Sequence, residues 1–359
     1  IDQLHPIHPS SLTSKCMEKP STSVAQIKRL IEDKSDDSSA VVLRETSKSW
    51  IFLAQDRVYK LKKQVRDDLQ DLTSLRARFD NCLTEVDLNR RLARETYLGV
   101  TRVVRHSDGT LGLGGNAETV DWLVEMQRLP ADKMLDTMAV KDIAPTAKIR
   151  SSVDQLAERL TDFYAHCPAS QLNASELITI FHDQQKMNST CLRNPLFVEF
   201  HPRFEAVFDA LSIAFLRHFP LFETRVNTGW VRECHGDLRP EHICMTTPPL
   251  VFDCLEFNRN LRLVDPFSEI MFLGLEADIL GLDWIKPALI THLARGLGAS
   301  PLPDLLALYE TQHALLRTRL CLAHLLVPNP RTPAKWLPLG LRYFDVAERR
   351  LFGPNGLAR

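Results

Sequence analysis

The spacing of apolar residues changes along this chain, and the change restricts its fold more than any other feature. From residue 73 to residue 92 apolar side chains recur every three to four positions, which predicts a helix with one buried stripe. Short apolar runs separated by polar turn residues lie on both sides of it and predict antiparallel strands at 40–44, 50–53, 58–62, 100–105 and 120–126. The first third of the chain is therefore predicted to be a sheet with one helix.

After residue 130 the pattern is helical almost to the end of the chain. The clearest predicted helices are 149–165, 175–187, 204–219 and 302–326. A β-rich first third and a helical remainder predict an α+β fold with two lobes, a small sheet lobe and a larger helical one. The expected boundaries are a loosely packed lead-in at 1–38 with a short helix at 24–31, a sheet lobe at 39–128 and a helical lobe at 129–359.

Size and composition agree with a soluble protein of this kind. A chain of 359 residues exceeds what one hydrophobic core usually serves. With 44% hydrophobic and 25% charged residues and a net charge of -1, it has no electrostatic reason to bind nucleic acid. No apolar run approaches the roughly 20 residues of a membrane helix, and the eight cysteines form no Cys-x-x-Cys pair. We therefore expect a cytoplasmic protein with reduced thiols and no membrane partner.

The segment 234–258 carries the residues best suited to chemistry. Two short apolar runs flank the turn Thr246-Thr247-Pro248-Pro249, so they are predicted to pair as a hairpin. Counting outward from the turn sets His242 opposite Asp253, with Cβ atoms roughly 5 Å apart. Asp237 precedes the first run, so the hairpin would gather two carboxylates and a histidine.

Such a set of side chains suits phosphoryl transfer. One carboxylate can take the proton of an attacking hydroxyl, and another can hold a divalent metal on nucleotide phosphates. The plainer interpretation is that Asp237 and Asp253 only cap a turn and a helix, since Asp is common in loops. The two together favour a site.

A lysine on the third predicted strand adds to this set. Val58, Lys60 and Lys62 share one face of the strand, so Lys60 lies beside an apolar neighbour and needs an acidic partner. Glu85 flanks the apolar stripe of the predicted helix and is the candidate. The alternative is an exposed edge strand in which lysines discourage aggregation, and Lys62 is the second choice on the same face.

These motifs together resemble the aminoglycoside phosphotransferase and choline kinase families, which share a protein-kinase-like fold. The resemblance rests on His235-Gly236-Asp237 and Asp253-Cys254-Leu255-Glu256-Phe257-Asn258, with Val58-Tyr59-Lys60-Leu61-Lys62-Lys63 upstream. It covers about residues 43–326 and looks like a bacterial branch of that superfamily. It implies Asp237 as catalytic base and His235 as a structural member of its loop.

The resemblance also implies the remaining roles. Asp253 would hold Mg²⁺ or Mn²⁺, and Lys60 would pair with Glu85 and reach the phosphates of ATP or GTP. Ser47, in the glycine-free loop 46–49, would contact phosphate, and Met126 would begin the link between lobes beside the base. His242 stands where related kinases carry the asparagine of the second metal position, so it is a candidate metal ligand or a hydrogen-bond partner of Asp237 or Asp253.

Three functions fit these residues. The first is a kinase that transfers the terminal phosphate of a nucleotide to a small hydroxyl-bearing acceptor, chosen by residues 144–230 and 275–350. The second is a weakly active pseudokinase that binds nucleotide or a protein partner as a regulator. The third is a metal-dependent hydrolase with His235, Asp237, His242 and Asp253 as ligands, which leaves the lysine strand unexplained. Three acidic residues could attract a cationic acceptor, although acidic residues on a helix are usually just solvated: Glu269, Glu276 and Asp278.

Overall fold

The computed structural model describes residues 22–34, 40–67, 69–140, 146–330 and 332–358, and these residues form two compact units. The first, which we call the sheet unit, contains the described residues from 22 to 133 together with Leu250–Arg259. The second, the helical unit, contains 134–249 and the chain from residue 260 onward. The predicted α+β class is confirmed.

The sheet unit is built on six antiparallel strands in the order β1-β2-β3-β8-β6-β7. Their bounds are β1 Val42–Glu45, β2 Ser49–Leu53, β3 Arg57–Lys62, β6 Tyr97–Arg105, β7 Leu111–Leu113 and β8 Glu118–Gln127. Two-residue strands β4 (Arg66–Asp67) and β5 (Gln70–Asp71) form a separate small pair. Because β3 lies between β2 and β8, the edge-strand interpretation of its lysines is wrong.

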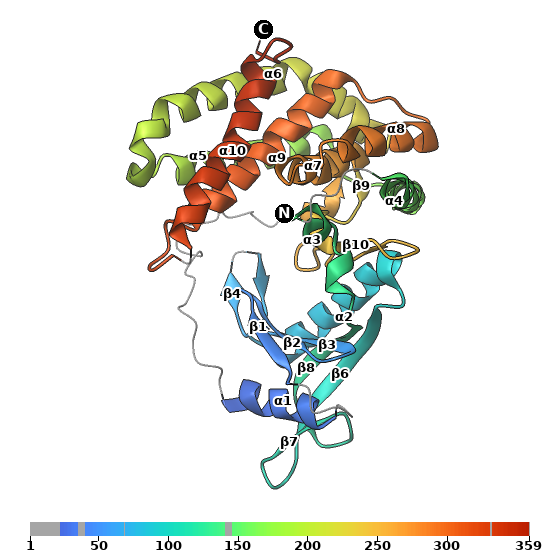
Figure 1. Ribbon diagram of the computed structural model, residues 1–359. Helices are drawn as coiled ribbons and strands as arrows, with labels where there is room; N and C mark the ends of the chain where they lie inside the picture. Colours follow the sequence, from blue (N-terminus) through green and yellow to red (C-terminus); the bar gives the residue numbers. More distant parts are fainter. Residues whose placement is uncertain (1–21, 35–39, 68, 141–145, 331, 359) are drawn as a thin grey trace. The chain divides into compact units, whose positions relative to one another are not determined.

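Two helices cover opposite faces of this sheet (Figure 1). Helix α1 (Thr22–Asp33) packs on Phe52, Tyr59 and Leu61, whereas α2 (Leu75–Ala93) packs on the face that carries Val58. Alternation along β3 therefore directs Lys60 and Lys62 to the side of α2, as the sequence predicts.

Helix α1 corresponds to the short helix predicted at 24–31, but it is firmly packed. Val24, Ile27 and Ile31 are each at most 4% exposed, and they belong to the same hydrophobic cluster as Phe52. The described part of the expected lead-in is thus a structural layer of the sheet unit.

The segment Leu250–Arg259 also belongs to the sheet unit, although it lies far along the chain. It begins with strand β11 (Leu250–Val251), and Leu250 and Phe252 pack against the cluster that contains Cys82 and Val86 of α2. This packing carries Asp253 to the lysine face of the sheet.

The helical unit contains eight α-helices among the described residues: α3 Leu135–Val140, α4 Ala147–His166, α5 Ala174–Leu192, α6 His201–Asn227, α7 Pro266–Ile279, α8 Ile285–Leu297, α9 Pro303–Ala323 and α10 Pro333–Phe352. Helix α7 is buried along nearly its whole length. It begins at Asp265, whose side chain accepts a hydrogen bond from the Phe267 amide, with Pro266 in the first helical position.

Short elements shape the loops between α6 and α7. Strand β9 (Arg232–Glu233) pairs with β12 (Leu263–Val264), and a 3-10 helix η4 (Pro240–His242) precedes β10 (Ile243–Cys244). His242 is therefore the last residue of a 3-10 turn. The hairpin prediction assumed that it was the outer residue of a strand, and this is wrong. The boundary between the units lies at Pro249, and the predicted pairing of His242 with Asp253 stays a prediction.

Two chain-wide properties follow from the described residues. None of their helices is long and apolar enough to cross a membrane. The seven described cysteines are all buried free thiols, which agrees with the predicted absence of disulfides among them.

Candidate active site

Lys60 lies between two carboxylates in the sheet unit. Its Nζ is 2.8 Å from Glu85 Oε1 and 3.0 Å from Asp253 Oδ1. Glu85 is fully buried, and the Lys60 side chain is 14% exposed, whereas that of Asp253 is 42% exposed. The structure thus brings together the strand lysine, the helix glutamate and the aspartate of 253–258 that the sequence singles out.

A second lysine extends this group into the core. Lys62 Nζ contacts Glu85 Oε2 and lies 2.5 Å from Glu256 Oε1, and its side chain is 2% exposed. Glu85 is therefore shared by two ammonium groups. The five residues Lys60, Lys62, Glu85, Asp253 and Glu256 form a continuous ion-pair chain, which we call the lysine cluster.

Mutual attraction keeps the charges of this cluster in place. Burial disfavours the charged Lys60 ammonium, but Asp253 and Glu85 outweigh that effect and raise its pKa well above the usual value. Burial likewise opposes the charged Lys62, yet Glu85 and Glu256 raise its pKa. For Glu256, burial raises the pKa, but Lys62 and Lys60 lower it more, so the pKa lies below its usual value. Both lysines are held as cations.

The backbone at Asp253 is fixed by the neighbouring helix and strand. Asp253 has φ 60°, a left-handed conformation that is uncommon for a residue with a side chain. Its amide donates to the Tyr97 hydroxyl at 3.3 Å, and the Cys254 amide donates to Asn89 Oδ1 at 2.8 Å. Asn89 in turn donates to the Glu85 carbonyl, one turn earlier on α2. Helix α2 therefore positions both Glu85 and the segment after Asp253.

The loop between β1 and β2 carries Ser47, which is exposed. Its neighbour Thr46 folds back, so that Thr46 Oγ1 accepts hydrogen bonds from the amides of Ser49 at 2.9 Å and Lys48 at 3.4 Å. Lys48 itself lies 2.9 Å from Asp67 and over the Phe257 ring. Two backbone amides of this loop are therefore already bound by the Thr46 side chain, unlike the amides of a glycine-rich phosphate loop.

Met126 lies near the end of β8 and is 9% exposed. It faces α2 within the same hydrophobic cluster as Val86 and Tyr97. Its side chain is a core residue, so any contact of this position with a nucleotide base would fall to its backbone or to the residues after Gln127.

The helical unit contains the loop with His235, Gly236 and Asp237. Glu269 on α7 accepts hydrogen bonds from the amides of His235 at 3.0 Å and Gly236 at 2.6 Å, and the Tyr164 hydroxyl donates to it at 2.7 Å. Glu269 is 3% exposed. This residue is a buried support for the loop, so the expectation that it attracts a cationic acceptor is wrong.

The side chain of His235 also serves the loop. His235 is 1% exposed, and its Nδ1 accepts a hydrogen bond from the Asp237 amide at 3.3 Å. Gly236 between them has φ 87°, a value that glycine adopts without a Cβ penalty. These contacts tie the His235 side chain to its own loop, and its structural role stays a prediction.

Asp237 lies at the surface of the loop, where Arg239 covers it. Arg239 Nη2 donates to Asp237 Oδ2 at 3.0 Å, and Nε lies 3.0 Å from Oδ1 at an angle too poor for a hydrogen bond. Arg239 Nη1 also lies 2.6 Å from Glu241. His242 Nδ1 is 2.8 Å from the Asp237 carbonyl oxygen, and the His242 side chain is 8% exposed.

Two further residues, Asp265 and Arg262, fix the segment that follows. Asp265 binds Arg225 through both carboxylate oxygens and accepts a hydrogen bond from Tyr309 at 2.9 Å. Arg262 donates to Glu233 at 2.7 Å. Both residues are almost fully buried, as expected for residues that hold the start of α7.

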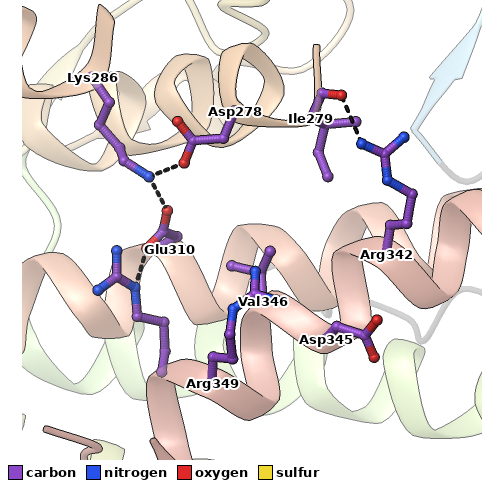
Figure 2. Close-up of a pocket in the computed structure, with 9 residues that line it drawn as sticks. Asp278, Ile279, Lys286, Glu310, Arg342, Asp345, Val346 and Arg349 are labelled. Carbon is purple, nitrogen blue, oxygen red and sulfur yellow. Dashed lines mark hydrogen bonds and ion pairs between the residues drawn. The ribbon is translucent and has the colours of Figure 1, made fainter. Parts of the chain in front are cut away.

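The other acidic residues proposed to attract a cation are already paired. Glu276 lies 2.8 Å from Arg317, and burial raises its pKa. Asp278 contacts Lys286 at the edge of a pocket of about 480 Å³ lined by α7, α8, α9 and α10. Figure 2 shows Lys286 between Asp278 and Glu310, and Arg342 reaching the Ile279 carbonyl. These charges neutralise one another, and none of the predicted catalytic residues lines this pocket.

Metal binding was predicted for Asp253 and His242. Among the residues that the structure describes, no three His, Cys, Asp or Glu side chains converge as they would around a metal ion. Asp253 offers a partly exposed carboxylate, the donor type that Mg²⁺ prefers.

Several important residues were not assigned a role from the sequence. Asn89 and Tyr97 accept hydrogen bonds from backbone amides, and such contacts leave no motif. Glu269 acts in the same way, although the sequence suggested a different role for it. Glu256 lies just past Asp253 in the sequence, which makes it a candidate to line the site.

The protein-kinase-like fold consists of a sheet unit and a mainly helical unit. In this chain the sheet unit carries the strand lysine and the helix glutamate, and the helical unit carries the His-Gly-Asp loop. A comparison with solved structures shows this fold directly. A choline/ethanolamine kinase family protein from Mesorhizobium loti aligns over 94% of this chain and 97% of its own, with a TM-score of 0.52 and 14% identity. A choline kinase from Streptococcus pneumoniae is also similar, with 90% and 98% coverage, a TM-score of 0.49 and 13% identity.

Curated relatives also exist in sequence. Uncharacterised proteins of Mycobacterium tuberculosis and Mycobacterium bovis are 27% identical to this chain over 260 residues. The match covers 68% of this chain and 47% of each relative, so the chain spans about half the length of the curated relatives it matches. No protein-family model matches the chain.

Proposed function

We propose that this protein is a small-molecule kinase that transfers the terminal phosphate of ATP or GTP to a hydroxyl-bearing acceptor. The observation that carries the proposal is the position of Lys60 between Glu85 and Asp253. Kinases of this fold need a lysine cation for the nucleotide phosphates, a helix carboxylate to orient it, and an aspartate for the metal. The similar solved structure from Mesorhizobium loti is a choline/ethanolamine kinase family protein, which agrees with this function.

The residues present fit a bound magnesium nucleotide. Asp253 would hold the ion, because it is the most exposed carboxylate of the three that surround the two lysines. Bound Mg²⁺ would neutralise charge on the phosphates. Lys60 stays protonated because its pKa is raised, so it would offer a permanent positive charge to a phosphate oxygen.

Asp237 would act on the acceptor. The acceptor oxygen forms a bond to the terminal phosphorus, the bond from that phosphorus to the bridging oxygen breaks, and the nucleoside diphosphate leaves. The proton of the acceptor hydroxyl passes to the Asp237 carboxylate. Glu269 accepts hydrogen bonds from two backbone amides of the loop, so the Asp237 side chain is not needed to hold the loop. It can accept the proton once its hydrogen bond with Arg239 opens or leaves one carboxylate oxygen exposed.

A regulator with little catalytic activity is the second candidate. It is favoured by the contact between Arg239 and Asp237, because the guanidinium lies against the carboxylate oxygens that an acceptor hydroxyl would have to reach. Such a protein would bind nucleotide and then pass the signal to a partner without turnover.

Calorimetric titration with ATP and GTP, each with Mg²⁺, with Mn²⁺ and with neither, tests the nucleotide part of the proposal. We expect metal-dependent binding that Asp253→Ala abolishes. Asp108→Ala is the matched control, because Asp108 is an exposed turn carboxylate in the same unit. Equal loss in both variants, or binding by neither nucleotide, would contradict the proposal.

A screen of hydroxyl-bearing metabolites by release of nucleoside diphosphate then separates the two candidates. The kinase proposal expects an acceptor that stimulates release, and Asp237→Asn to lower turnover at least ~100-fold with nucleotide affinity nearly unchanged. Tight nucleotide binding with no release for any acceptor would favour the regulator. A collapse of affinity in Asp237→Asn would make Asp237 a binding residue.

A further inference from the structure

His242 stands at a loop position that helps to hold a second metal ion in related kinases. In protein kinases one ion is held by an aspartate after a strand and the other involves an asparagine of the catalytic loop. The sequence pattern places His242 at the asparagine position. An imidazole nitrogen is a poor ligand for Mg²⁺, which prefers oxygen. The donor set of the second position therefore does not fit the magnesium ion that this fold implies.

Hydrogen bonding fixes which ring nitrogen of His242 carries the proton. The Nδ1 atom is 2.8 Å from the Asp237 carbonyl oxygen, which can only accept. In the neutral ring Nδ1 must therefore be the N–H, and Nε2 carries the lone pair. Arg239 Nη2 lies 3.4 Å from that Nε2, and a guanidinium can only donate.

The same guanidinium contacts the carboxylate of Asp237. Its Nη2 donates to Oδ2 and its Nε lies beside Oδ1, each at 3.0 Å. Its Nη1 is 2.6 Å from Glu241. One cation thus touches the oxygen atoms and the nitrogen atom that Asp237 and His242 would otherwise present to a metal. A guanidinium keeps its charge at any pH at which the protein is folded.

We propose that the Arg239 guanidinium occupies the second-cation position of this kinase-like loop, so that the protein uses a single divalent ion. The inference rests on the proposed function for its role in phosphoryl transfer. In that role Arg239 is a positioning residue, because it acts through Asp237 and fixes the orientation of its carboxylate. His242 adds a neutral acceptor beside Arg239, since its Nε2 lone pair lies 3.4 Å from Arg239 Nη2.

The inference is tested by counting bound Mn²⁺ from the electron paramagnetic resonance signal of the free ion. Without nucleotide, Arg239→Ala should bind one more Mn²⁺ per chain than the wild type. Asp237, Glu241 and His242 do not converge while Arg239 is present, but the loss of the guanidinium would let the two carboxylates turn towards an ion together with the imidazole. The double variant Arg239→Ala/His242→Ala should lose that ion. Arg239→Gln, which keeps most of the side-chain volume, should behave as Arg239→Ala. Arg295→Ala, an exposed arginine of α8, is the control and should match the wild type.

The nucleotide arm separates this inference from the proposed function. With ATP present, the wild type should bind one Mn²⁺ per nucleotide and Arg239→Ala should bind two. Two ions in the wild type, or equal counts in the wild type and Arg239→Ala without nucleotide, would overturn the inference and leave the proposed function intact. Absence of nucleotide binding would overturn the proposed function, while the counts on the free protein would still decide whether Arg239 excludes a metal ion.

Discussion

The two regions that carry the proposed functional residues are stabilised in different ways. In the lysine cluster the functional side chains hold one another, since Lys60, Lys62 and Glu85 are buried ions that need each other. In the His-Gly-Asp loop the support comes from Glu269, which binds backbone amides, and Asp237 remains 30% exposed. Function and stability should therefore be inseparable in the first region and separable in the second.

Substitution of Glu85 should give the largest effect on stability. Glu85→Ala leaves two buried ammonium groups without their shared carboxylate, and breaking a buried ion pair costs about 3–5 kcal/mol. Urea denaturation of the variant measures the loss, with Asp87→Ala, an exposed carboxylate of the same helix, as control. A loss below about 1 kcal/mol would show that the lysine cluster does not stabilise the sheet unit.

Acid should weaken the helical unit through His313. This residue is buried against Phe272, and burial lowers its pKa from 6.5 to about 4. The folded ring stays neutral while the unfolded ring takes a proton. Its contribution is thus complete above pH 6.5 and is lost as the pH falls towards 4, by about 3 kcal/mol in total.

Comparison with His313→Gln isolates this contribution. The fall in unfolding free energy between pH 7 and pH 4.5 should be smaller in the variant, which has no group to protonate there. Identical acid dependence in the two proteins would mean that His313 is protonated in the folded state.

Glu269→Gln should lower the unfolding free energy by less than the two changes above, and its effect should be limited to the stability of the His-Gly-Asp loop and its surroundings. The neutral amide weakens the hydrogen bonds from His235 and Gly236, and hydrogen bonds to a charged group contribute about 1.5–3 kcal/mol. We expect a loss of about 2 kcal/mol and faster hydrogen exchange at the Gly236 amide. Glu158→Gln, an exposed residue of α4, should change neither. Unchanged exchange at Gly236 would mean that the loop has another support.

Asp237→Asn should have the smallest effect on folding. Its side chain is partly exposed and its pair with Arg239 lies near the surface, so the unfolding free energy should change by less than about 1 kcal/mol. Turnover should nevertheless fall at least ~100-fold. A large loss of stability would contradict the separation of support and function in this loop.

Much of the fold could be predicted because it depends on local periodicity. The strands around Trp50 and Lys60 and the helix of Glu85 follow from apolar residues at spacings of two and of three to four. The packing of α1 could not be predicted, because a short amphipathic segment gives no information about which surface it covers.

The candidate site divides in the same way. The residues Lys60, Glu85 and Asp253 were predicted from alternation, periodicity and resemblance, and the structure joins them. The pairing of Glu256 with Lys62 and the role of Asn89 could not be predicted, since both depend on where Leu250–Arg259 packs.

The sequence by itself determined that a sheet with one helix is followed by a mainly helical remainder. It also determined which face of β3 carries both lysines and which chemical groups are available for phosphoryl transfer. Only the tertiary structure decided which charges meet: that Glu85 serves two lysines, that Glu269 holds the loop, and that Arg239 covers Asp237. The physical reason is the distance along the chain over which each effect acts. Periodicity acts over a few residues, whereas an ion pair between residues far apart in sequence forms only where packing brings them within about 4 Å.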